Sequence, residues 1–241
     1  MKIPALRGII RRRILLNYRL EPEVVAALLP KPFRPKLVAG KAIAGICLIR
    51  LEQIRPRSFP AFLGIASENS AHRFAVEWGT GSEKREGVFV PRRDTGSLMN
   101  SLAGGRIFPG VHHHSKFAIE DRDGRITLHA EAADQTDDLV HLELSESREF
   151  PADSVFDSLA DSSAFFEAGC VGYSSRPDSP RLDGLLLQVP NWKVSPLKIH
   201  EARSAYFDDR ALFPEGCIEL DHALLMRDTE HEWHAEPELA S

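Results

Sequence analysis

Three consecutive histidines, His112, His113 and His114, are the residues of this sequence with the most evident chemical capacity. Two imidazoles on one side of a strand can ligate a metal ion, and one enclosed imidazole can act as a general acid or base because its unperturbed pKa is about 6.5. A closed metal site needs a third or fourth ligand, and no HExxH, HxxEH or Cys/His pattern occurs nearby. We therefore predict no metal site and no cofactor; a solvated or hydrogen-bonded histidine face is the simpler interpretation.

Strand periodicity separates the three histidines. The stretch from Val111 to Glu120 alternates with a period of two, which places His113 on the apolar face. The polar face carries His112, His114 and Lys116. If the apolar face lines a cavity, His113 is its acid-base group; a packed histidine bonded to the backbone is the alternative. Lys116 is predicted to be exposed, whereas an imine-forming lysine needs an enclosed or cationic environment.

Two other segments have chemical potential. The sequence RRDT at positions 92–95 precedes a short helix predicted over Gly96 to Ala103, and its arginines could hold an anion near the free N–H groups of that helix. Asp94 is also explained as the helix N-cap. Cys170 could act as a nucleophile, but a buried structural thiol is the simpler interpretation. No glycine-rich phosphate-binding pattern occurs, so nucleotide binding has no support.

The bulk properties are those of an ordinary soluble protein. The 241 residues are 43% hydrophobic and 27% charged, and a net charge of -5 gives no reason to expect nucleic acid or an anionic membrane as partner. No repeat or linker divides the chain, so residues 1–241 are expected to form one domain, with roughly the last ten residues as a flexible acidic tail. Three widely separated cysteines indicate reduced thiols and a cytoplasmic location. The oligomeric state stays open, with a homo-oligomer as one alternative.

The elements around the histidines are mainly strands. Pro22 opens a short helix that Pro30 ends, and Pro151 to Glu167 form the one longer helix. Turn signals occur at 39–40 and 123–124. Strands are predicted over 9–18, 36–38, 41–51, 63–78, 87–90, 111–120, 125–133, 139–145, 185–189, 192–207 and 215–226. Many strands joined by short turns predict an α+β protein of mainly antiparallel β structure, closed or curled upon itself.

Three stretches carry a family resemblance. They are YRLEPEVVAALLPKPFRP from Tyr18, SENSAHRFAVEW from Ser67 and GVFVPRRDTGSLMNSLAGGRIFPGVHHHSKF from Gly87, and the sequence CVGYSS from Cys170 is a weaker match. On these residues the chain resembles the DUF2071 family of uncharacterised proteins, in the acetoacetate decarboxylase-like superfamily. The resemblance implies a cone-shaped, mostly antiparallel β-barrel with a few peripheral helices and an interior cavity.

The resemblance also implies positions for site residues. Acetoacetate decarboxylases use a Schiff-base lysine beside a second lysine, just downstream of a Gly-Arg pair. With that pair placed on Gly105-Arg106, His113 takes the position of the reactive lysine and His114 that of its neighbour. An imidazole cannot form the imine that serves as the electron sink. A family carboxylate is similar in position to Glu68, and an N-terminal arginine is similar in position to Arg11.

The sequence thus predicts a β-barrel that binds a small organic molecule bearing a carbonyl or carboxylate. His113 and Glu68 are expected to perform acid-base chemistry of the lyase, hydratase or isomerase kind, without a Schiff-base lysine, and Arg106 and Arg11 are expected to bind the ligand. The alternative is a non-catalytic ligand-binding barrel or a structural one with a filled interior.

Overall fold

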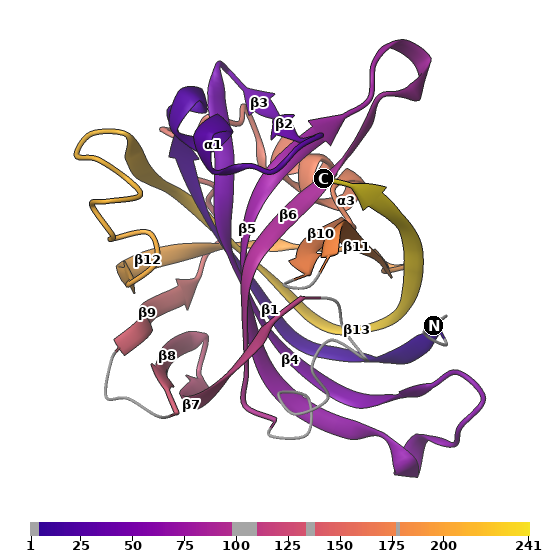
Figure 1. Ribbon diagram of the computed structural model, residues 1–241. Helices are drawn as coiled ribbons and strands as arrows, with labels where there is room; N and C mark the ends of the chain where they lie inside the picture. The colour runs from indigo at the N-terminus through magenta and orange to yellow at the C-terminus, as the bar shows by residue number, and fades with distance from the viewer. Residues whose placement is uncertain (1–4, 98–109, 134–137, 177–178) are drawn as a thin grey trace.

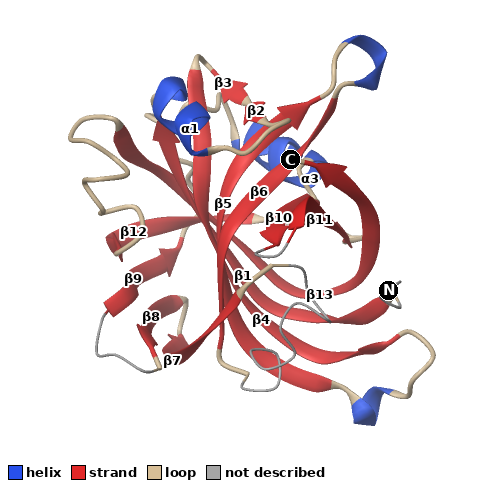
Figure 2. Ribbon diagram, viewed as in Figure 1, coloured by secondary structure: helices blue, strands red, loops and turns tan. Residues whose placement is uncertain are grey.

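The chain forms one curved β-sheet that closes in a ring, with short helices at its periphery (Figures 1 and 2). The computed structural model describes residues 5–97, 110–133, 138–176 and 179–241. The predicted mainly antiparallel β architecture is confirmed. In chain order the elements are β1 (Leu6–Leu20), α1 (Pro22–Leu28), β2 (Arg34–Pro35), β3 (Leu37–Val38), β4 (Lys41–Pro56), η1 (Ala61–Leu63), β5 (Ile65–Trp78), η2 (Gly81–Glu83), β6 (Arg85–Thr95), β7 (His112–Arg122), β8 (Arg125–Ala132), β9 (Asp138–Glu146), α3 (Leu159–Ala168), β10 (Val171–Arg176), β11 (Ser179–Gln188), β12 (Ser195–Ser204) and β13 (Ile218–Ala240).

The sheet closes twice because two of its strands, β6 and β13, each pair with different neighbours at their two ends. The hydrogen-bonded order is β11-β10-β6-β7-β8-β9-β12-β13-β1-β4-β5-β2, and β11 also pairs with β13 while β5 pairs with β6. Strands β6, β5, β4, β1 and β13 therefore belong to two rings. We call the ring completed by β10 and β11 the small ring, and the ring completed by β7, β8, β9 and β12 the large ring. The pairs of β6 with β10 and with β7 are parallel, which makes the sheet mixed.

The shared strands are buried on both faces, as β1 shows. Ile14 and Leu16 pack with Ile126 in the main apolar core, which fills the large ring. Leu15, between them in the chain, packs instead with Phe166 of α3 on the opposite face. Successive side chains of a strand point to opposite faces, so a strand with two covered faces reads as a nearly continuous apolar run. Any polar side chain on these strands is consequently enclosed.

A β-bulge in β6 changes which residues face the small ring. Phe89 and Arg92 lie opposite Phe74 and His72, respectively, so β6 has one residue more than β5 over this interval. One extra residue reverses the alternation of side chains beyond it. Apolar residues before the bulge and Arg93 after it therefore line the same interior.

Of the predicted helices, one begins where it was predicted and another is shorter than predicted. Helix α1 begins at Pro22, as predicted, with proline in its first turn. The predicted helix over Pro151 to Glu167 is helical only from Leu159 to Ala168, because Ser158 caps it by accepting the Asp161 N–H. The predicted helix over Gly96 to Ala103 lies mostly outside the described residues. Within the described part of the chain, no helix combines the length and the apolar character needed to cross a membrane.

The acidic C-terminal residues are part of the sheet. Instead of forming a flexible tail, they continue β13 to Ala240, which lies opposite Arg181 of β11. Arg176 and Arg181 also contact Glu238 at 3.3 and 3.0 Å. This end of β13 completes the small ring.

Candidate functional site

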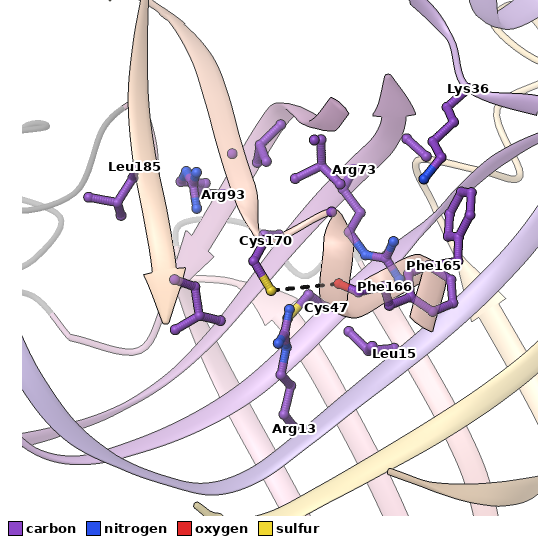
Figure 3. A pocket seen from close by; sticks show the side chains of 18 of the residues that line it. Arg13, Leu15, Lys36, Cys47, Arg73, Arg93, Phe165, Phe166, Cys170 and Leu185 are labelled. Atoms are coloured by element: carbon purple, nitrogen blue, oxygen red, sulfur yellow. Dashed lines mark hydrogen bonds between the residues drawn. The ribbon is translucent and has the colours of Figure 1, made fainter. Parts of the chain in front are cut away.

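An interior cavity of about 80 Å³ lies inside the small ring, and every strand of that ring contributes to its wall. Phe165 and Phe166 of α3 complete the wall (Figure 3). A second cavity, of about 70 Å³, adjoins the first and shares Arg13, Cys47 and Arg93 with it. We call the two together the small-ring cavity. Its size suits a small molecule.

Three arginines reach this cavity from three of the strands that the two rings share: Arg13 from β1, Arg73 from β5 and Arg93 from β6. Arg73 is only 4% exposed; it donates a hydrogen bond to Asn17, and its guanidinium lies 4.6 Å from the centroid of the Phe166 ring. This stacked, hydrogen-bonded side chain has a fixed orientation.

The other two arginines are held by weaker partners. Arg13 donates its Nε–H to the sulfur of Cys47 at 3.2 Å and lies 5.4 Å from the centroid of the Trp192 ring. Arg93 donates to the hydroxyl of Ser174 at 3.4 Å. Neither contact neutralises a positive charge.

The cavity therefore holds positive charge with unused donors. Nη1 of Arg13, Nε of Arg73 and Nε of Arg93 are buried and have no hydrogen-bond partner among the described residues. Burial, helped by the nearby Arg13, lowers the pKa of Arg73 to about 10, and burial alone lowers the pKa of Arg93 to about 10. All three remain cationic at neutral pH. The Asp94 carboxylate in the second part of the cavity is paired with Arg92, not with these three arginines. A buried cation without a paired counter-charge is unfavourable, so this arrangement is suited to an anion.

The histidines divide differently from the sequence prediction. His112 lines the small-ring cavity beside Arg93, its partner in the parallel pairing of β7 with β6. His113 is exposed and is not among the residues that line the cavity. The apolar face of β7 packs toward the large ring through Phe117, so the opposite face meets the cavity. Burial, with repulsion from Arg93, lowers the pKa of His112 to about 4, so this imidazole is neutral at pH 7.

Glu68 points away from the small-ring cavity. Its carboxylate lies 2.8 Å from Arg12 and 3.9 Å from Arg50, and Arg12 also lies 3.7 Å from Asp121. Burial raises the pKa of Glu68, although Arg12 acts in the opposite direction. The structure thus does not bring Glu68 and His113 together in one cavity, and their catalytic roles stay predictions.

Glu68→Ala is expected to lower the free energy of unfolding by about 2 kcal/mol, because the nearly buried Arg12 loses the side chain that accepts its hydrogen bond. Urea unfolding at pH 7 measures this change. The matched control is Glu52→Ala, which breaks an exposed pair with Arg11 and should have a smaller effect. Equal effects of the two substitutions would show that the Arg12 pair has no special structural role.

The predicted ligand-binding arginines do not contribute to the described site. Arg11 is exposed and pairs with Glu52 at 2.9 Å and with Asp228 at 2.6 Å. Arg106 lies outside the described residues. The predicted exposure of Lys116 is confirmed; its amine is 3.8 Å from Glu131.

Lys36 is a lysine of the cavity wall that sequence analysis did not single out. Its amine lies 2.8 Å from a carboxylate oxygen of Glu86 and 4.1 Å from the centroid of the Phe165 ring. This ion pair holds the amine at the edge of the cavity, and Figure 3 shows it on the side of α3 away from Arg13.

A buried series of hydrogen bonds fixes Asn17, the hydrogen-bond partner of Arg73. His222 lies 2.5 Å from Asp221 through Nδ1, and through Nε2 it lies 2.8 Å from Ser162 Oγ and 3.0 Å from Asn17. The order Asp-His-Ser resembles a nucleophilic triad, but Ser162 and His222 are 0% exposed and line no described cavity. Asn17 also accepts a hydrogen bond from Arg73. This series of hydrogen bonds therefore connects α3 to the sheet and orients the Arg73 guanidinium.

Sequence analysis missed Arg13, Arg73 and Cys47 as site residues. The available signal was an arginine within an apolar strand run, as in RILL for Arg13 and HRFAV for Arg73. A charged residue in a strand buried on both faces must line a polar cavity or find a partner.

Solved structures show the same fold. Acetoacetate decarboxylase from Legionella pneumophila is 14% identical with a TM-score of 0.59, covering 97% of this chain and 87% of that one. An acetoacetate decarboxylase-like enzyme from Sphingomonas wittichii is 14% identical with a TM-score of 0.62, covering 100% and 95%. The enduracididine biosynthesis enzyme MppR, complexed with pyruvate, is 10% identical with a TM-score of 0.59, covering 100% and 91%.

At these identities the likeness shows the fold alone. No curated protein matches the sequence. The family DUF2071, described as an uncharacterized conserved protein, matches residues 10–224. The chain therefore belongs to the DUF2071 family and has an acetoacetate decarboxylase-like fold.

Proposed function

We propose that this protein binds a small carboxylate, in particular a 2-oxo acid, in the small-ring cavity. The observation that carries the proposal is the unused Nε–H of Arg73, a side chain only 4% exposed, beside the unused donors of Arg13 and Arg93. A guanidinium matches a carboxylate in charge and in planar geometry, and its hydrogen bonds to an anion are stronger than those to a neutral group.

The surroundings favour an anion over a neutral guest. The nearby groups that shift the pKa of Arg73 and Arg93 are thiols and another arginine. Asp94, the one carboxylate among the described residues that line the cavity, is already paired with Arg92 at 2.8 Å. Apolar side chains such as Leu185, Leu187 and Val90 line the rest of the wall and suit a short carbon skeleton. The pyruvate complex of MppR, a protein of the same fold, is consistent with this ligand class.

The proposal extends to catalysis on the bound 2-oxo acid. Guanidinium groups next to a bound carbonyl stabilise negative charge that develops on its oxygen, which favours enolisation, hydration or cleavage next to the carbonyl. Non-catalytic binding of the same ligand is the alternative. The free thiols of Cys47, Cys170 and Cys217 fit a reducing, cytoplasmic location.

Ligand binding is tested with pyruvate and acetone, which share a ketone and differ in the carboxylate. Calorimetric titration and thermal unfolding should show that pyruvate binds and raises the Tm, whereas acetone does neither. Lactate and acetate should also bind, because they keep the carboxylate. Turnover of pyruvate or its exchange of methyl protons with deuterated water would separate catalysis from binding. Equal responses to pyruvate and acetone, or no response to any carboxylate, would contradict the proposed function.

A further inference from the structure

Cys47 lies where the two parts of the small-ring cavity meet. It lines both of them and accepts the Nε–H of Arg13 at 3.2 Å. Its side chain is partly exposed, so it is accessible from the cavity. Figure 3 shows Arg13 and Cys170 converging on the region of Cys47 from different elements. A thiol in this position can reach a molecule held by the arginines.

The other two thiols are less suited to react. Cys170 also lines the cavity, but its S–H donates to the carbonyl oxygen of Phe166 at 3.6 Å, and burial raises the pKa of the thiol. Cys217 is buried in the apolar core of the large ring. A reactive cysteine is expected in an electropositive and accessible environment, which among these three describes Cys47.

The unpaired N–H groups of the three arginines determine which ligand atoms can lie next to the Cys47 sulfur. Arg73 and Arg93 offer N–H groups to a carboxylate, and Arg13 offers Nη1 from the same guanidinium whose Nε holds Cys47. A second oxygen of the ligand that accepts from Arg13 is therefore placed beside the thiol. A carboxylate with an adjacent carbonyl, as in a 2-oxo acid, supplies both oxygens on neighbouring carbon atoms.

We propose that Cys47 adds reversibly to the carbonyl carbon of a bound 2-oxo acid, an inference that rests on the proposed function. The C–S bond forms as the π electrons of the carbonyl move to its oxygen, and the proton that leaves sulfur ends on that oxygen. The product is a hemithioketal, and no group is oxidised or reduced. Arg13 donates to the oxygen on which charge develops, and binding holds carbon and sulfur in position.

The experiment uses pyruvate labelled with ¹³C at its carbonyl carbon and the full-length protein. In the wild type, the bound carbon resonance should move from the ketone region to the region of tetrahedral carbon. Cys47→Ala should still bind pyruvate but should keep the ketone resonance. The matched control is Cys217→Ala, which removes a thiol outside the small-ring cavity and should behave as the wild type. Alkylation of Cys47 by iodoacetamide should slow about tenfold at a pyruvate concentration about ten times its Kd.

The outcomes separate this inference from the proposed function. Bound pyruvate that keeps its ketone resonance in the wild type overturns the covalent step and leaves carboxylate binding intact. A tetrahedral signal that persists in Cys47→Ala assigns the adduct to another group or to the hydrate and also overturns it. A stable mass increase on Lys36 after borohydride reduction would identify an imine instead. Failure of pyruvate, lactate and acetate to bind would contradict the proposed function itself.

Discussion

Arg73→Met is expected to weaken pyruvate binding by about 100-fold, because a charge-assisted hydrogen bond in an enclosed site contributes about 1.5 to 3 kcal/mol and the loss of a buried charge adds to it. The free energy of unfolding should change by less than about 1 kcal/mol. Methionine keeps much of the contact with Phe166, and removal of an unneutralised buried cation offsets the loss of the bond to Asn17. Calorimetric titration and urea unfolding measure the two quantities.

The matched control is Arg12→Met, because Arg12 is a second buried arginine on the same sheet that already has carboxylate partners in Glu68 and Asp121. Its substitution should lower stability and leave pyruvate binding unchanged. The two substitutions therefore have opposite profiles if Arg73 serves a ligand and Arg12 serves the fold. Unchanged pyruvate binding in Arg73→Met, together with a large loss of stability, would assign Arg73 to the fold as well.

His72→Phe is expected to remove about 3 kcal/mol of the destabilisation that acid causes. His72 is 1% exposed, neither ring nitrogen has a hydrogen-bond partner among the described residues, and its ring centroid lies 4.8 Å from that of Tyr206. Burial lowers its pKa to about 4. The unfolded chain binds this proton near pH 6.5, so the folded state loses stability as the pH falls from about 6.5 to about 4.

The measurement is the free energy of unfolding at pH 8 and pH 4.5 for each protein. The difference between the two pH values should be smaller in His72→Phe than in the wild type, whatever the packing cost of the new ring. Other buried histidines, such as His231, whose pKa burial also lowers to about 4, keep part of the acid sensitivity. His200→Gln, at an exposed position, should leave the difference unchanged. The same pH difference in His72→Phe and wild type would mean that His72 is not a source of it.

The sequence predicted the fold better than the site because local signals determine strands and turns. The positive φ angles of Ala39 and Gly40 and of Asp123 and Gly124 lie where the turn signals predicted them. The length of β13 was not predictable, because charged residues after Arg227 become a strand only by pairing with β1 and β11. Tertiary pairing overrides local preference there.

The site was harder to predict because its residues depend on which face of each strand borders the cavity. Neighbouring residues in the sequence do not determine that. Alternation correctly grouped His113 with Phe117, but the apolar side of β7 belongs to the core of the large ring. The cavity lies on the other side, where His112 meets Arg93 across the parallel pair. The choice between His112 and His113 therefore required knowing that the sheet closes into two rings with strands in common.

The bulge of β6 makes chain length, and not only residue identity, a requirement of the cavity. Deleting one residue between Phe89 and Arg92 would force one half of the strand to turn over. Either Phe89 would enter the cavity, or Arg93 would enter the apolar interior and Arg92 would take its place. No single substitution restores the side-chain orientations on both sides of the deletion. A relative that keeps three arginines in this cavity is therefore expected to align with this chain through β6 without a gap.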